Sequence, residues 1–298
     1  MEGSNIMQIR KISTAFLLLM MVAGGLISCD LLVLDEDTEY PTRIPALKLG
    51  ELESLNQEYH ALNDSTLCST LNEFGYTGYS TVLFGEEGNP CDRQNREVVR
   101  IEMSELDTLE SAAKKALWKN RDFTGVQDTT ALELTAIIPL PGCTQNCGGP
   151  DENSVNIEWK LTFAEQVVDS AKVIGTEIIV VMDARGVNRI WGNWYPEFNV
   201  PEFINYGYQD VQEGMVGWEI DMRSFTGEEK IYTIKEEDVG TEPEMVHLPI
   251  ISDTDTELRT CWAVSVRYGA QDFAGWYAFI DIEEGFLVKL VPMGEIIP

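Results

Sequence analysis

His247 and Cys261 are the two residues whose types come nearest to a catalytic pair. They lie on predicted strands that flank a polar loop at 253–257, and pairing that is symmetric about Thr254 would set them opposite each other. An imidazole beside a thiol can lower the pKa of the thiol and produce a nucleophilic thiolate. A cysteine inside an apolar strand is also typical of a buried structural thiol. We favour the structural thiol and assign no catalytic residue.

The polar loop itself carries a weak calcium signature. Asp253, Asp255 and Glu257 place oxygen ligands at alternate positions, as at the start of a calcium-binding loop. The central glycine and the distal glutamate of an EF-hand are missing, and a solvated hairpin tip explains the same residues. We therefore expect neither a metal nor another cofactor. Acidic residues are so numerous that no carboxylate pair can be singled out for acid–base catalysis.

The densest aromatic segment of the chain follows a predicted hairpin. Glycine and proline interrupt it, so it suits neither a regular strand nor a regular helix. Rigid rings give contact area at low entropic cost, which is typical of a surface that binds a peptide or a glycan. A connector that packs between two modules is the alternative. The candidate binding residues are Trp191, Trp194, Tyr195 and Phe198.

Composition limits the classes of function. The chain has 298 residues, and its 21 Lys and Arg face 50 Asp and Glu, which gives a formal net charge of −29. Such a surface repels phosphate, so nucleic acid is not an expected partner. The chain has 2 histidines, which disfavours a His-rich zinc site and a catalytic triad. Hydrophobic residues make up 44%, enough for a packed core.

The N-terminus has the pattern of a secretory signal. Arg10 and Lys11 precede an apolar stretch of about 13 residues, 15–27, which is shorter than a membrane-spanning helix. The stretch ends in Leu26-Ile27-Ser28-Cys29, which resembles the lipobox of bacterial lipoproteins. That resemblance implies cleavage before Cys29 and attachment of diacylglycerol and an acyl chain such as palmitate. Several chains give a stable membrane anchor. An ordinary signal peptide and an uncleaved membrane helix are the alternatives.

An acidic tether follows the anchor. Asp30, the run 35–37 and Glu39 precede Pro41 and Pro45. Acidic residues just after a lipid-bearing cysteine resemble the surface-export signals of Bacteroidota lipoproteins. In enteric bacteria an Asp at this position resembles an inner-membrane retention signal instead. We expect a protein of the bacterial cell envelope, on the outer membrane, and the leaflet stays open.

Export would place the other cysteines in an oxidising compartment, where disulfides persist. Cys143 and Cys147 lie in a turn-rich loop that a small disulfide would close. Cys68 and Cys91 bracket a glycine-rich stretch and are predicted to pair. Cys261 is then left over. Sequence alone does not prove this connectivity.

Apolar spacing predicts a helix over about 47–62, then a strand at 98–101 and a helix that starts at the N-cap Ser104. A strand at 131–138 and an alternating strand at 157–163 follow, with Trp159 on its buried face. The runs at 176–182 and 187–191 predict a hairpin.

The same order returns at 230–291, where strands are predicted at 230–234, 244–251, 262–266, 276–282 and 286–291. The two passages align with Trp159 on Trp262 and Asp183 on Asp281. We infer an internal repeat of an α+β unit, with the helix of the second copy mostly lost.

These residues also suggest a family. The order helix, strand, Trp-containing strand and closing strand resembles the PepSY and peptidase-propeptide domains of bacterial envelope proteins, over about 97–192 and more loosely over 229–291. The closing motif reads Ile280-Asp-Ile-Glu-Glu-Gly-Phe-Leu287 here, and Met182-Asp-Ala-Arg-Gly-Val187 in the first copy. The resemblance implies an inhibitory, chaperoning or regulatory module without catalysis. The chain has no H-E-x-x-H motif, so a peptidase precursor is not expected.

The predicted fold is α+β, with two antiparallel-sheet PepSY-like modules. We expect a lipid-anchored, non-enzymatic module that binds a protein, peptide or glycan. The alternatives are an envelope hydrolase with acidic residues in an intermodule cleft and a structural subunit of an outer-membrane complex. The predicted parts are a signal peptide (1–28), a tether (29–46), a helix with the Cys68/Cys91 region (47–96), module 1 (97–200) and module 2 (201–298).

Overall fold

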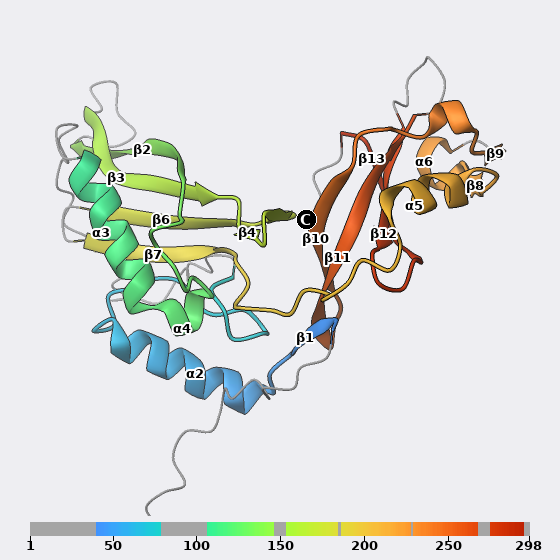
Figure 1. The fold of residues 1–298 in the computed structure, drawn as a ribbon. Helices are drawn as coiled ribbons and strands as arrows, with labels where there is room; N and C mark the ends of the chain where they lie inside the picture. Colours follow the sequence, from blue (N-terminus) through green and yellow to red (C-terminus); the bar gives the residue numbers. More distant parts are fainter. Residues whose placement is uncertain are drawn as a thin grey trace, which may run out of the picture. The chain divides into compact units, whose positions relative to one another are not determined.

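The computed structural model describes residues 40–78, 106–145, 153–183, 186–227, 229–267 and 275–294 (Figure 1). Its strands form two larger sheets and one two-stranded ribbon, and nearly all neighbouring strands are antiparallel. The protein is therefore an α+β protein. The predicted signal peptide, the lipid-bearing Cys29 and the strand predicted at 98–101 lie outside the described residues.

The first sheet is an antiparallel meander in the order β2-β3-β6-β7. The hairpin predicted over 176–191 is confirmed as β6 and β7. Helix α3 (Leu106–Lys119) lies across one face of this sheet (Figure 1). The strands are β2 (Leu134–Gln145), β3 (Asn153–Ala164), β6 (Glu177–Asp183) and β7 (Gly186–Asn193).

The core between α3 and the first sheet follows the predicted spacing. Leu109, Ala113 and Leu117 recur every four residues, so they share one face of α3, and all three are buried. They belong to one cluster with Trp159 and Phe163 of β3. Helix α2 (Leu49–Leu62) confirms the helix predicted at 47–62, and its partly buried leucines pack against the same cluster.

One residue of β3 departs from the predicted alternation. Glu158 was expected on the solvent face, yet it is buried. Its carboxylate accepts hydrogen bonds from Arg189 Nη2 at 2.7 Å and Asn188 Nδ2 at 3.1 Å, both on β7. A buried carboxylate is tolerated only with such partners, and neither partner is adjacent in sequence.

The second sheet has seven strands in the order β13-β12-β11-β10-β5-β4, with β1 paired to β11. Strand β5 pairs in parallel with β10, so residues within the predicted module 1 complete the second sheet. Strand β1 lies within the predicted tether. The strands are β1 (Thr42–Pro45), β4 (Val167–Val168), β5 (Ala171–Val173), β10 (Glu244–Ile251), β11 (Asp255–Val266), β12 (Trp276–Asp281) and β13 (Leu287–Pro292).

The second sheet buries apolar residues on both faces. Val264 and Trp276 face one cluster, together with Val211 and Met215 of helix α5 (Tyr208–Met215). Cys261 and Phe279 belong to a second cluster. Smaller elements accompany α5: β8 (Glu219–Asp221), α6 (Arg223–Thr226), β9 (Ile231–Thr233) and a 3-10 turn at Glu236–Asp238.

The two meanders share a register. Trp159 pairs with Met182 in the first sheet, and Trp262 pairs with Ile280 in the second. The next strand pair is interrupted at the matching place, because the register shifts between Val181 and Met182 in one sheet and between Phe279 and Ile280 in the other. A β-bulge at the same point of two meanders is a specific local feature. The two meanders therefore match in register and in the position of the bulge, while the repeat of a whole module stays a prediction.

The helices that accompany the two sheets differ in their place along the chain. The second sheet has a helix over its core, α5, which lies upstream of the predicted strand 230–234, while 236–238 form only a 3-10 turn. The strand at 231–233 pairs with β8 and not with the main sheet. A second repeated signature precedes both meanders, since Arg121-Asp-Phe-Thr-Gly125 and Arg223-Ser-Phe-Thr-Gly227 each form one helical turn that ends at a left-handed glycine.

Candidate functional site

A cavity of about 140 Å³, which we name the aromatic cleft, lies where the loop 72–78 faces the end of β7 and the residues that follow β7. Four aromatic side chains contribute to its lining, together with uncharged polar residues and the apolar side chains of Ile44 and Ile251. The lining residues that carry the argument below are Phe74, Tyr76, Thr77, Asn193, Trp194 and Tyr195.

The first wall is a tight loop that is held by its own polar groups. Asn72 Oδ1 accepts hydrogen bonds from the backbone N–H of Phe74 at 3.1 Å and of Tyr76 at 3.0 Å. Gly75 has φ +83°, and a Cβ there would lie 2.8 Å from a methyl carbon of Leu55. The loop therefore needs both the asparagine and the glycine to present its two rings.

The second wall is fixed through its backbone. The side-chain amide of Gln166 donates to Tyr195 O at 2.8 Å and accepts from Tyr195 N at 3.0 Å. Gly125 packs against the same turn, because a Cβ on it would lie 2.9 Å from Trp194 O. The two aromatic residues of this wall are thus held by groups that lie 29 residues or more away in sequence.

Thr77 is the one lining residue with an unsatisfied buried group within the described part of the chain. Its side chain is 2% exposed, and its Oγ1 has no hydrogen-bond partner. Its backbone N–H donates to Phe123 O at 2.8 Å, which fixes the residue in place. An unpaired buried hydroxyl costs about 1–3 kcal/mol. Thr77 Oγ1 has less than 1 Å² of accessible surface, so it lies behind the surface of the cleft and not open to it.

The cleft carries little charge. Glu73 is the one charged residue among the described residues of its lining. Burial raises the pKa of Tyr195 to about 12, and burial followed by the negative charge of Asp122 raises the pKa of Tyr76. Both phenols therefore remain neutral at physiological pH. The cleft offers π faces, hydroxyls and amides, and no positive charge for an anionic ligand.

The four aromatic residues that the sequence singled out lie in three different environments. Trp194 and Tyr195 line the aromatic cleft. Phe198 is buried, with its ring centroid 5.1 Å from that of His247, so it belongs to the core. Trp191 is half-buried outside the cleft, where Arg189 lies 5.9 Å from its ring. The sequence did not single out Phe74 and Tyr76, because they come to line one cavity with Trp194 only through contacts between segments that are far apart in sequence.

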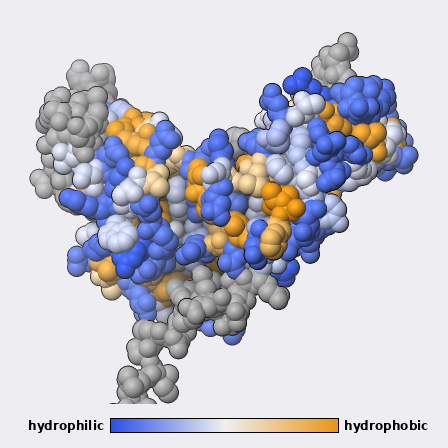
Figure 2. Space-filling model, in the orientation of Figure 1, coloured by the Kyte–Doolittle hydropathy of each residue, from blue (hydrophilic) through white to orange (hydrophobic). Residues whose placement is uncertain are grey.

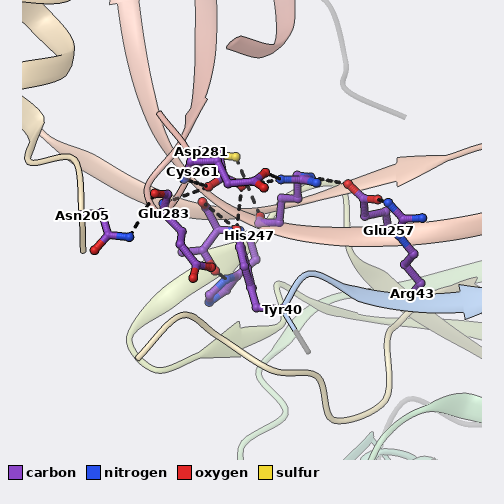
Figure 3. Close-up of polar contacts among 11 residues, drawn as sticks. Tyr40, Arg43, Asn205, His247, Glu257, Cys261, Asp281 and Glu283 are labelled. Carbon is purple, nitrogen blue, oxygen red and sulfur yellow. Dashed lines mark hydrogen bonds and ion pairs between the residues drawn. The ribbon is translucent and has the colours of Figure 1, made fainter. Parts of the chain in front are cut away.

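A buried polar cluster holds the segment 40–45, which the sequence assigned to the tether. Asp281 is 0% exposed, and its Oδ2 accepts from Tyr40 Oη at 2.8 Å and from Arg259 Nη1 at 2.9 Å. Its Oδ1 accepts from the backbone N–H groups of Glu283 and Glu284, each at 2.8 Å. Figure 3 shows Tyr40 and Asp281 reaching each other from the N-terminal segment and the end of β12.

Arg259 is the cation of this cluster. Its Nη1 donates to Glu284 at 2.6 Å, its Nε donates to Glu257, and its guanidinium lies 4.8 Å from the Phe286 ring. Burial alone would lower its pKa, but the hydrogen bonds that it donates to Glu257, Glu284 and Asp281 raise its pKa. Arg43 also pairs with Glu257, at 2.6 Å. The carboxylates that converge here are therefore occupied by arginine, as in a structural ion-pair network.

The predicted opposition of His247 and Cys261 is wrong by one residue. His247 pairs with Thr260, while Cys261 pairs with Val246, so the two side chains point to opposite faces. His247 instead contacts Thr260 Oγ1 and Val168 O, each at 3.0 Å, and burial lowers its pKa. Burial, and then the charge of Asp281, raises the pKa of Cys261. Cys261 is a buried free thiol, as favoured.

The residues of the calcium signature, Asp253, Asp255 and Glu257, do not form a metal site. Asp255 begins β11 and accepts a hydrogen bond from Ser252 Oγ at 2.6 Å, while Glu257 is engaged by Arg43 and Arg259. Over the described ranges, no group of three or more His, Cys, Asp and Glu side chains is arranged to hold a metal ion.

The predicted disulfides stay predictions, because Cys91 and Cys147 lie outside the described residues. Cys68 is buried, and Cys143 is part of β2. None of the helices in the described ranges has the length and apolar character needed to cross a membrane.

Comparison of the chain with protein-family models, curated proteins and solved structures finds no match. The resemblance to PepSY domains therefore stays a proposal.

Proposed function

We propose that the chain is a lipid-anchored protein of the bacterial cell envelope, on the outer membrane, that binds a protein, peptide or glycan partner without transforming it. The single observation that carries the binding function is the aromatic cleft. Ligand sites are concave, mostly apolar and largely preformed, with a few polar groups that orient the ligand. Gln166, Asn72 and Gly125 give the walls of this cleft such a preformed geometry.

The face of the molecule that Figure 2 shows argues for a local site. On the face that Figure 2 shows, hydrophobic residues form small patches between hydrophilic ones. Small scattered patches are normal on a protein surface, whereas a broad apolar patch would indicate a large docking face. The resemblance to PepSY modules agrees with a binding or regulatory role, and the resemblance to a lipobox supplies the anchor at Cys29.

The hydrolase alternative gains no support from the described carboxylates. Hydrolysis by an acid–base pair needs two carboxyl groups that face a substrate cavity. Glu257, Asp281 and Glu284 come together, but all three accept hydrogen bonds from Arg259. Among the described residues that line the aromatic cleft there is one carboxylate, Glu73. The chemistry of the site therefore favours binding.

The test uses the full-length chain, solubilised in a non-glycosidic detergent and applied to immobilised peptides and glycans. We expect saturable binding to one of the two classes, with loss of binding in Trp194→Ala. Trp118→Ala is the matched control, since Trp118 is a tryptophan that is 51% exposed on α3. Turnover of a bound probe, or binding that survives Trp194→Ala, would overturn the proposal.

The anchor has its own test. Cys29→Ser removes the sulfur that would carry the lipid, so we expect the variant to leave the membrane fraction while the wild type stays in it. Tight membrane association of the Cys29→Ser protein would contradict lipidation at this position. Cys261→Ser, at the buried thiol, controls for the loss of a cysteine as such.

A further inference from the structure

We infer that His247 is a positioning residue for the aromatic cleft, and that acid weakens ligand binding there by protonating the buried imidazole. This inference rests on the proposed binding function and adds the regulation of the same site. His247 lies on β10, is 1% exposed and does not line the cleft. It must therefore act through the segments that it contacts.

His247 contacts both segments that build the second wall of the cleft. Its Nε2 lies 3.0 Å from Val168 O. Two residues before Val168 stands Gln166, whose side-chain amide holds the backbone of Tyr195. The ring centroid of Phe198, three residues after Tyr195, lies 5.1 Å from that of His247. The imidazole therefore joins the two segments to each other and to β10.

Backbone hydrogen bonds hold this junction in place. Val173 N donates to Gln166 O at 2.8 Å, and Ile174 N donates to His247 O at 2.9 Å. Gln166 N also donates to Thr176 Oγ1, at 2.9 Å. Close-packed interiors transmit strain. A displacement of the imidazole therefore shifts the segment that carries Gln166, and the paired amide of Gln166 passes this shift to the wall of the cleft.

The hydrogen bonds of the ring suit its neutral form. Val168 O can only accept, so Nε2 carries a proton, and Nδ1 is then free to accept from Thr260 Oγ1 at 3.0 Å. A second proton, on Nδ1, would take this acceptor away from Thr260 and would place a positive charge in a buried site. Burial lowers the pKa of His247, and the hydrogen bond to Val168 and the charge of Asp169 offset this effect only in part.

The groups that face His247 supply no counterion in contact with it. Of the elements packed against the ring, β11 presents Thr260, β5 presents Val173 and the segment after β7 presents Phe198. Among the described residues, Asp169, in the turn after β4, is the charged group that acts on the ring. The folded protein therefore favours the neutral imidazole, and a state with a displaced wall takes up the proton more readily.

The sign of the pH effect follows. Ligand affinity should be complete above the ordinary pKa of 6.5 and should fall as the pH drops through the lowered pKa of the folded protein. Because one proton is taken up, the loss should reach at most tenfold for each pH unit.

The decisive variant is His247→Gln, measured beside His247→Leu in the full-length chain at pH 7.5 and 5.0. Glutamine can donate to Val168 O as the imidazole does, but it does not titrate, while leucine has no donor. The probes are the immobilised peptides and glycans that Trp194→Ala fails to bind. His247→Gln should bind as the wild type does at pH 7.5 and keep that affinity at pH 5.0. His247→Leu should bind more weakly at both.

The chain offers a matched control in its other histidine, His60. His60→Gln should bind at pH 7.5 as the wild type does and should lose affinity at pH 5.0 to the same extent. A loss at pH 5.0 that His247→Gln shows as well would come from other titrating groups and would overturn the role of His247.

An NMR titration tests the positioning without any ligand. The indole N–H resonance of Trp194, identified by its absence in Trp194→Phe, should shift with the same midpoint as the ring C–H resonances of His247. The shift should vanish in His247→Gln and persist in His60→Gln. A Trp194 resonance that does not follow His247, or an imidazole that stays neutral down to pH 5.0, would overturn the inference.

The remaining outcomes separate this inference from the proposed function. Binding that needs Trp194 but is equal at the two pH values in the wild type would overturn the acid effect and leave the binding function standing. Binding to none of the peptides and glycans would overturn the proposed function, and the acid effect with it. If His247→Leu does not fold, His247→Gln and the NMR titration still decide the question.

Discussion

The two meanders have the same register but use the matching aspartate differently. Asp183 follows Met182 at the end of β6 and is half-buried, whereas Asp281 follows Ile280 at the end of β12 and is fully buried. In the second sheet this aspartate binds Arg259 and Tyr40. One scaffold therefore serves two purposes: the second sheet holds the N-terminal segment, and β7 of the first leads into the aromatic cleft.

The hydroxyl of Tyr40 helps to attach the N-terminal segment, 40–45, to the second sheet. Strands β1 and β12 pair with different stretches of β11, 255–258 and 261–266. Between them, Thr260 N donates to Tyr40 Oη at 2.8 Å, and this hydroxyl donates to Asp281. A side chain thus fills the interval between two strands, and the last part of the predicted tether, 40–45, becomes part of the sheet.

The largest difference between the sheets is expected for Asp281→Ala against Asp183→Ala. Removing Asp281 leaves Arg259 without its most buried partner, and breaking a buried ion pair costs about 3–5 kcal/mol. The free energy of unfolding of the full chain, from denaturant titration, should fall by that amount for Asp281→Ala. It should fall by less for Asp183→Ala, because Asp183 is only half-buried and water can solvate the groups around it. Equal losses would mean that the two aspartates have the same role.

The repeated glycines give the next largest contrast. Gly125 (φ +73°) and Gly227 (φ +76°) both end an R-x-F-T-G turn, so alanine at either position costs about 1 kcal/mol of backbone strain. At Gly125 the new Cβ also meets Trp194 O at 2.9 Å, while nothing lies within 4 Å at Gly227.

We therefore expect Gly125→Ala to lose about 2–3 kcal/mol of unfolding free energy in total, with overpacking added to strain. It should also weaken ligand binding, because the wall of the aromatic cleft must move. Gly227→Ala should leave binding as it is. Equal effects at the two glycines, measured by denaturant titration and by binding, would show that the contact with Trp194 does not constrain the cleft.

Tyr40→Phe removes only the hydroxyl that joins β11 to Asp281. A hydrogen bond to a charged group contributes about 1.5–3 kcal/mol, so the free energy of unfolding should fall within that range. Tyr232→Phe, which removes a hydrogen bond to the more exposed Asp238, should have a smaller effect.

The same tyrosine predicts a pH dependence. Burial, and then the hydrogen bond and charge of Asp281, raises the pKa of Tyr40 above its ordinary value of 10.0. The folded state therefore keeps a proton that the unfolded state loses, so this contribution is complete below pH 10 and is lost as the pH rises beyond it. Unfolding free energies measured between pH 8 and about 11 should decline less steeply in Tyr40→Phe than in the wild type. Parallel curves would contradict this assignment.

Local patterns were sufficient to predict much of the fold. Periodicity located α2 and α3, and alternation located β3 with Trp159 on its buried face. The aligned tryptophans also indicated the repeat. The repeated R-x-F-T-G turns could have strengthened that inference, since both are visible in the sequence and end at a glycine.

The errors arise where distant segments meet. Periodicity cannot show that β5 leaves the first meander to pair with β10, or that Glu158 is buried by β7. A one-residue difference in register separates His247 from Cys261. The cleft was half predicted, because Trp194 and Tyr195 form a conspicuous aromatic run, while Phe74 and Tyr76 join them only through the folded loop 72–78.

The most direct test of the cleft is saturation-transfer NMR on the full-length chain in non-glycosidic detergent, with the peptide or oligosaccharide that binds best. Irradiation of the protein should transfer saturation to the protons of one short segment of the ligand. That transfer should disappear in Trp194→Ala and persist in Trp118→Ala. Transfer spread evenly along the ligand, or transfer that survives Trp194→Ala, would contradict a site in the aromatic cleft.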